Sequence, residues 1–214
     1  MAAALALSLY LAGLAVAFGA RSWIHRRRTG STGFRGLSGA PGSAEWWGGI
    51  LFAIALVLGA AGPVLALTGA VAAPRLPAAF TWAGAFITIV GFFGVLAAQA
   101  GMGASWRVGV DATERTELVT TGAFAVVRNP IFTAMLTTMA GLALLVPTAV
   151  SAAALLCLLV AVELQVRLVE EPYLLRTHRQ VYASYAAATG RFVPGLGHLP
   201  RPAQAARRAV EERS

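Results

Sequence analysis

Residues 131–166 read IFTAMLTTMAGLALLVPTAVSAAALLCLLVAVELQV. Glu163 is the one charged residue in this stretch, and Pro147 divides it into apolar runs at 131–146 and 148–166. A run of about 20 apolar residues spans a bilayer as a helix, and proline interrupts a helix because it lacks a backbone N–H. The stretch therefore predicts a hairpin of two membrane helices joined by a tight turn.

The composition places the rest of the chain in the same environment. Of 214 residues, 57% are hydrophobic and 12% are charged, whereas a soluble domain carries about 25% charged residues. Three more apolar runs precede the hairpin, at residues 2–20, 46–72 and 80–100. The sequence predicts an all-α membrane protein with about five transmembrane helices.

The first apolar run resembles a signal peptide in length but not in charge order. A signal peptide carries positive charge before its apolar region. Here the arginines follow the run, at Arg21, Arg26, Arg27 and Arg28. We therefore expect residues 2–20 to be retained as a membrane anchor.

The arginines also predict the orientation of the chain. All 17 basic residues are arginine: five lie between 21 and 45, one lies at 75, three lie between 107 and 128, and eight follow from 167. Cytoplasmic loops carry the excess of arginine and lysine, so we expect the N-terminus outside and the C-terminus in the cytoplasm. The use of arginine alone, with abundant alanine and glycine, indicates GC-rich coding and hence a bacterial inner membrane.

Two classes of site are not expected. The net charge of +8 comes from arginines beside the apolar runs, where they contact lipid headgroups more readily than nucleic acid. The single cysteine, Cys157, and the scattered histidines, His25, His178 and His198, show no metal-ligand spacing. We therefore predict neither a nucleic-acid partner nor a metal site.

Polar residues gather at the end of the fifth run. Glu163, Arg167, Glu170 and Glu171 are spaced i, i+4, i+7 and i+8, which predicts one helical face and a Glu163–Arg167 pair. A carboxylate near the hydrocarbon faces a partner or a cavity. Two interpretations stay open: a salt-bridged stripe that anchors the helix end, or part of a binding site.

Two further polar segments precede the fourth run. Arg128-Asn129-Pro130 predicts a helix start, with Asn129 at the N-cap and Pro130 at the first helical position. Arg128 either snorkels to headgroups or contacts a ligand. Gly101 and Gly103 either end the third helix or permit close backbone approach.

Together, these segments predict one pocket at the cytoplasmic surface, with carboxylates, a guanidinium, glycine backbone and several aromatic rings. The rings belong to Trp106, Phe124, Phe132, Tyr173, Tyr182 and Tyr185. Such a set suits a ligand that carries cationic and anionic groups and a flat ring.

Four segments carry a family resemblance: GMGASWRVGVD from 101, LVTTGAFAVVRNPIF from 118, EEPYLL from 170 and YASYAAATGRFVPG from 182. In order and spacing they resemble the integral-membrane methyltransferases of the isoprenylcysteine carboxyl methyltransferase and phospholipid N-methyltransferase type. The resemblance covers about residues 101–195. It departs at Asn129, where the family has histidine, and at Phe132, where tyrosine is usual; Asn129 cannot titrate near neutral pH.

The resemblance implies S-adenosylmethionine as cofactor and a cytoplasmic C-terminal segment that binds it. The cofactor-binding residues that it implies are Gly101, Gly103, Arg128, Asn129, Pro130, Phe132, Glu170, Glu171, Tyr182 and Tyr185. The catalytic residues that it implies are Glu170, Glu171, Arg191 and Asn129. Arg191 would close the pocket or bind an acidic substrate.

The sequence thus predicts a membrane methyltransferase that acts on a lipophilic or small acceptor: a carboxylate, thiol, amine or lipid headgroup. The alternatives are an NADPH-dependent membrane reductase of the sterol-reductase type and a non-enzymatic membrane scaffold. We expect three regions: membrane helices in 1–100 with a flexible loop at 28–45, a catalytic core at 101–195, and a basic tail at 196–214.

Overall fold

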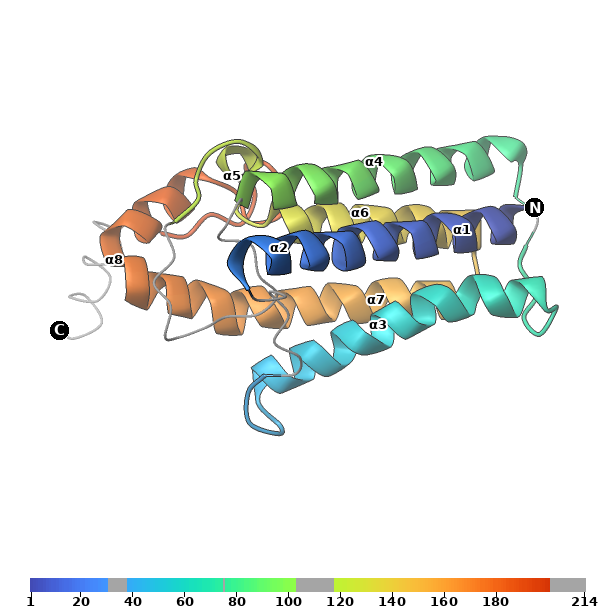
Figure 1. The fold of residues 1–214 in the computed structure, drawn as a ribbon, viewed down its shortest axis with the longest axis horizontal. Coiled ribbons are helices and arrows are strands. Elements are labelled where there is room, and N and C mark those ends of the chain that lie inside the picture. The colour runs from blue at the N-terminus through green and yellow to red at the C-terminus, as the bar shows by residue number, and fades with distance from the viewer. Residues whose placement is uncertain (31–37, 75, 103–117, 201–214) are drawn as a thin grey trace.

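The computed structural model describes residues 1–30, 38–74, 76–102 and 118–200 (Figure 1). These residues form helices and no strand, apart from one isolated parallel bridge between Val127 and Gly190. The elements in chain order are α1 (Ala2–Leu14), η1 (Ala15–Ala20), α2 (Arg21–Thr29), α3 (Ala44–Leu67), α4 (Ala78–Met102), α5 (Ala123–Val126), α6 (Pro130–Leu145), α7 (Ala149–Leu164), η3 (Gln165–Glu170) and α8 (Glu171–Ala188), where η denotes a π-helix.

The prediction of an all-α membrane protein is confirmed. Four helical stretches are long and apolar enough to cross a membrane: Ala2–Ile24, Ala44–Leu67, Ala78–Met102 and Ala149–Ala188. A shorter apolar helix, Pro130–Leu145, corresponds to the fourth predicted span. The second span ends at Leu67, short of the predicted residue 72, because Gly69 turns the chain with a φ of 76°.

The predicted hairpin is formed by α6 and α7. α6 ends at Leu145, before Pro147, and α7 begins after Thr148. The Thr148 hydroxyl accepts a hydrogen bond from the backbone N–H of Ser151 at 3.1 Å and so caps α7. Pro147 therefore lies in the turn between the helices, and Thr148 caps the second one.

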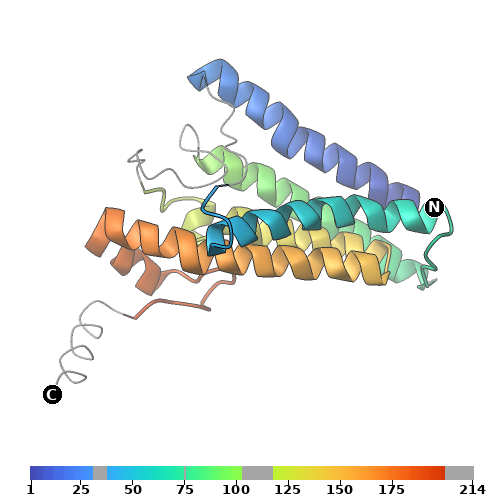
Figure 2. The ribbon, with the colours of Figure 1, turned by 90° about the horizontal axis from the view of Figure 1, so that it is seen from below.

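The bundle is built from two close helix pairs, α4 with α6 and α3 with α7 (Figures 1 and 2). Glycines permit the closest approach. A Cβ on Gly91 of α4 would lie 2.5 Å from the backbone nitrogen of Thr138, and one on Gly141 of α6 would lie 2.5 Å from that of Thr88. Small residues allow such backbone contact in membrane bundles.

The last helix is long and bent. α7, η3 and α8 form one helical stretch of 40 residues. Within α8, Arg179 has a φ of 45° and a ψ of −119°, and the chain kinks there. The kink folds the second half of α8 back toward α5 and the start of α6 (Figure 1). Both views place these elements at the end of the bundle opposite the N-terminus.

Several sequence predictions fall outside the described residues. They concern Gly103, Trp106, residues 31–37 of the predicted loop and residues 201–214 of the predicted tail. The predicted division into three regions and the predicted orientation stay predictions.

Candidate functional site

The site is built around the start of α6. Pro130 occupies the first helical position and Asn129 the N-cap position, as predicted. The Asn129 side chain does not cap the helix. Instead its Nδ2 donates to the backbone oxygen of Arg191 at 3.1 Å, and its backbone N–H donates to the same oxygen at 3.1 Å. The turn before α6 is therefore joined to a segment about 60 residues later in the chain.

That segment, residues 189–197, is called the strap below. Its tight turn depends on glycine: a Cβ on Gly190 would lie 2.2 Å from the backbone oxygen of Val193, and Gly195 and Gly197 have positive φ. The backbone N–H of Arg128 donates to Gly190 at 2.8 Å. The Thr133 hydroxyl donates to Phe192 at 2.8 Å. The strap thus lies along the start of α6.

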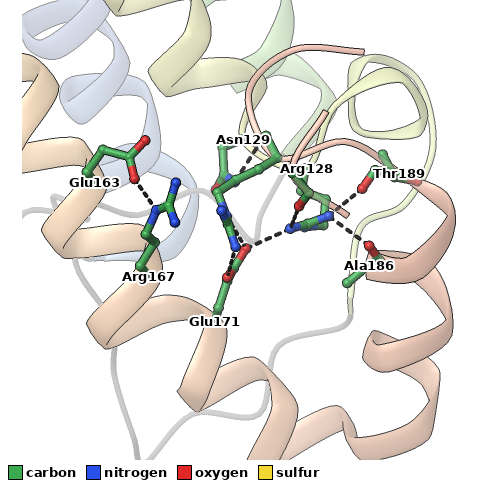
Figure 3. Close-up of polar contacts among 9 residues, drawn as sticks. Arg128, Asn129, Glu163, Arg167, Glu171, Ala186 and Thr189 are labelled. Atoms are coloured by element: carbon green, nitrogen blue, oxygen red, sulfur yellow. Dashed lines mark hydrogen bonds and ion pairs between the residues drawn. The ribbon is translucent and has the colours of Figure 1, made fainter. Parts of the chain in front are cut away.

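Arg128 is buried between α6, α8 and the strap (Figure 3). Its NH2 donates to Glu171 Oε1 at 2.8 Å and to the backbone oxygen of Gly197 at 2.9 Å. Its NH1 donates to the backbone oxygens of Ala186, at 2.9 Å, and Thr189. With 1% of its side chain exposed, Arg128 does not snorkel to headgroups, and that alternative is wrong.

Glu171 joins two guanidinium groups. Besides Arg128, its carboxylate accepts two hydrogen bonds from Arg191, through Nε at 2.8 Å and NH2 at 2.9 Å. These bonds raise the pKa of Arg191 above its usual value. Such two-pronged pairs are stronger and more directional than neutral hydrogen bonds. Glu171 therefore connects α8, the turn before α6 and the strap.

The other acidic residues of the helix lie differently. Glu163 and Arg167 form the predicted i, i+4 ion pair (Figure 3). Arg167 is 54% exposed in its side chain, whereas Glu171 is 7% exposed, so the two ends of the predicted polar stripe have different surroundings. Between them lies η3, which has the i→i+5 repeat of a π-helix.

Glu170 has a hydrogen-bond partner at the five-residue spacing of the π-helix. Its carboxyl is hydrogen-bonded to Gln165, five residues earlier. The Gln165 side chain in turn lies near Gly48 of α3, since a Cβ there would be 3.5 Å from Gln165 Oε1. Glu170 and Glu171 are thus adjacent in sequence but have different polar partners.

Three of the predicted aromatic residues line the same region. The Tyr185 hydroxyl donates to the backbone oxygen of Phe124 at 2.6 Å. The rings of Tyr182 and Tyr185 are 6.1 Å apart and inclined by 62°, an edge-to-face contact. Phe132 packs against the main hydrophobic core. Gly101 is exposed at the end of α4, with nothing within 4 Å of a Cβ placed there.

Several contributors had no clear signal in the sequence. Thr133, Thr189 and Gly197 contact the site through hydroxyl or backbone oxygens. The glycines of GRFVPGLG indicate turns, but a turn signal does not identify the element that it packs against.

The chemistry of the site fits S-adenosylmethionine in part. Nε of Arg128 is buried and has no hydrogen-bond partner among the described residues, so one donor is left for an acceptor oxygen. Both Glu171 oxygens already accept hydrogen bonds from arginine. Glu170, whose hydrogen-bond partner is the neutral Gln165, is the neighbouring carboxyl that is not paired with an arginine among the described residues.

Comparison with known families agrees with this region of the chain. The family model described as phospholipid methyltransferase matches residues 79–181, just under half of the chain. The match includes α4, the hairpin, the Arg128 turn and the Glu170–Glu171 pair, and it ends before the strap. The comparisons with curated proteins and with solved structures found no match. The predicted resemblance is therefore confirmed as a similarity of residues 79–181 to the phospholipid methyltransferase family.

Proposed function

We propose that this protein is an integral-membrane methyltransferase that uses S-adenosylmethionine and methylates a lipophilic or small acceptor. The observation that carries the proposal is the family match over residues 79–181. The convergence of Arg128, Glu171 and Arg191 at one end of the bundle supports it, because these residues come from three separate segments.

The roles of individual residues follow from their contacts. We assign Glu170 to the ammonium or a ribose hydroxyl of the cofactor, and Phe132 and Tyr185 to its ring or sulfonium. Asn129 supports the turn before α6 through Arg191. S-adenosylmethionine supplies a methyl group on a positively charged sulfur, and the chain's task is to hold donor and acceptor in line.

The acceptor determines whether a base is required. A carboxylate or thiolate attacks the methyl carbon without losing a proton, whereas a protonated amine must first lose one. Since both oxygens of Glu171 accept hydrogen bonds from arginine, Glu170 is the proposed base for an amine. A lipid, quinone-like or thiol acceptor suits the bacterial membrane that the composition indicates.

The proposed location is the cytoplasmic face of a bacterial inner membrane. The arginine distribution favours this orientation. Exposed apolar side chains along α4, including Trp82, Phe86 and Phe93, present a surface suited to lipid.

The reductase alternative gains no support from the site. It would use Arg128 and Arg191 to hold a phosphate, yet Glu171 accepts hydrogen bonds from both. The two cofactors are nevertheless compared directly in the experiment below.

The test is calorimetric titration of the purified protein in detergent with S-adenosylmethionine and, separately, with NADPH. We expect S-adenosylmethionine to bind and Glu170→Gln to weaken its binding by about tenfold or more, the loss expected for one charge-assisted contact. Glu163→Gln is the matched control, because Glu163 pairs with the exposed Arg167. Binding of NADPH alone would refute the proposal.

A second experiment addresses the reaction itself. Membranes with and without the protein are incubated with methyl-labelled S-adenosylmethionine, and labelled lipids and small molecules are identified by mass spectrometry. Label above the control identifies the acceptor class. Label at control level across several lipid extracts would contradict methyltransferase activity.

A further inference from the structure

The strap is attached to the rest of the protein by contacts of two kinds. Neutral hydrogen bonds join it to the start of α6, from Arg128 N to Gly190, from Asn129 to Arg191 and from Thr133 to Phe192. Charged side chains make the other contacts: the Arg128 guanidinium donates to the backbone oxygens of Thr189 and Gly197, and Arg191 pairs with Glu171 of α8.

Three of the about four acceptor positions of the Glu171 carboxylate are occupied by arginine. Oε1 accepts from Arg128 NH2 and Arg191 Nε, both at 2.8 Å, and Oε2 accepts from Arg191 NH2 at 2.9 Å. The side chain is 7% exposed. The charge of this buried carboxylate is thus already shared by two guanidinium groups, and a ligand ammonium that displaced either arginine would leave a buried guanidinium without its counter-charge.

We infer that Glu171 is a positioning residue rather than a cofactor ligand: through Arg128 and Arg191 it holds the strap against the start of α6. The inference deepens the proposed function, because the strap lies beside the residues assigned there to the cofactor. Glu170 and Glu171 then have separate tasks, with Glu170 facing the ligand and Glu171 ordering the chain around it.

The physical consequence is a strap that loosens when the charge is removed. Glu171→Gln keeps the size of the side chain but offers two guanidinium groups a neutral amide. The hydrogen bonds from Asn129 and Thr133 to the strap remain. The strap is therefore expected to open more often while the helical bundle stays folded.

Hydrogen exchange measured by mass spectrometry on the full chain in detergent tests, without any ligand, whether Glu171 holds the strap against the start of α6. The informative amides are those of Arg128, Arg191 and Leu196, which donate to Gly190, Leu196 and Val193. We expect Glu171→Gln and Arg191→Gln each to speed their exchange by about tenfold or more, the change expected for loss of a buried charged pair. The double variant should exchange no faster than Glu171→Gln alone, since Glu171→Gln already removes the ion pair with Arg191.

Conservative and control variants distinguish the loss of this ionic contact from a general destabilisation of the fold. Glu171→Asp keeps the charge and should recover part of the protection, whereas Glu163→Gln and Glu170→Gln should leave the exchange of the strap at the wild-type rate. If Glu171→Gln prevents folding, Arg191→Gln carries the test, because it breaks the same ion pair from the more exposed partner. Unchanged exchange in Glu171→Gln would overturn the inference.

Cofactor titration supplies the second readout. A positioning role predicts that Glu171→Gln and Arg191→Gln weaken S-adenosylmethionine binding by similar factors, with no further loss in the double variant. A direct ligand role predicts a loss in Glu171→Gln with a fully protected strap, and a further loss in the Arg191→Gln background. If the wild type binds no S-adenosylmethionine, the proposed function fails. The exchange experiment still decides whether Glu171 holds the strap against the start of α6.

Discussion

Gly91 of α4 lies so close to Thr138 of α6 that a Cβ on Gly91 would be 2.5 Å from the Thr138 backbone nitrogen. Any side chain at this position must push the two helices apart. We predict that Gly91→Leu lowers the free energy of unfolding by about 1–3 kcal/mol or more, as overpacking does. Thermal unfolding in detergent measures the change. Gly19→Ala is the control, because a Cβ there has nothing within 4 Å, and equal melting temperatures for both variants would contradict the packing argument.

Tyr10 provides a test of the contact between α1 and α3. Its buried hydroxyl donates to the backbone oxygen of Leu56 at 2.5 Å. Tyr10→Phe keeps the ring against Gly59 and removes only this hydrogen bond. We predict a loss of about 1 kcal/mol in the free energy of unfolding, read from thermal unfolding in detergent. A more stable Tyr10→Phe variant would show that this hydrogen bond contributes nothing.

Arg128→Lys tests whether the planar guanidinium is required. Arg128 donates to Glu171 and to three backbone oxygens at once. An ammonium is a compact point charge and cannot reproduce this fork. We predict that Arg128→Lys destabilises the protein by about 3–5 kcal/mol, the range for disrupting a buried charged pair. Chemical unfolding in detergent measures the loss; a change below about 1 kcal/mol would place the lysine in an equivalent network.

Arg179 offers a substitution that is expected to stabilise the protein or leave its stability unchanged. Its φ of 45° and ψ of −119° suit glycine better than a residue with a Cβ. Strain of about 1–3 kcal/mol is relieved in Arg179→Gly, offset by about 0.5–1 kcal/mol of chain entropy. Arg179→Ile should destabilise, because β-branched residues rarely adopt positive φ. If the two variants melt alike, the kink does not require the backbone conformation seen at this residue.

The membrane helices were the most predictable part of the fold. Their signal is local: an apolar run long enough for a bilayer, interrupted in the hairpin by Pro147. The start of α6 at Pro130 was predictable for the same reason. The Glu163–Arg167 pair also needed only neighbouring residues of one helix.

The candidate site was predictable as a collection of residues but not as a network. The segments that contain Arg128, Glu171 and Arg191 were predicted to meet, and these side chains do meet. Their pairing was not predicted, because residues 128 and 191 come together only through the folded hairpin and the kink at Arg179. The burial of Glu171 depends on Arg128 and Arg191, which come from distant segments, and residue spacing alone did not predict the π-helix η3. The cofactor contacts stay predictions.

The isolated bridge between Val127 and Gly190 has a consequence for biosynthesis. It joins the residues just before the hairpin to a segment synthesised after both hairpin helices and the whole of α8. Until that segment leaves the ribosome, the Arg128 guanidinium lacks the carbonyl oxygens of Thr189 and Gly197 and the strap arginine that shares Glu171. Insertion of the helices and formation of the hydrogen-bond network around Arg128 are therefore separate events. A chain that terminates before residue 189 would be anchored in the bilayer without the strap contacts of that network.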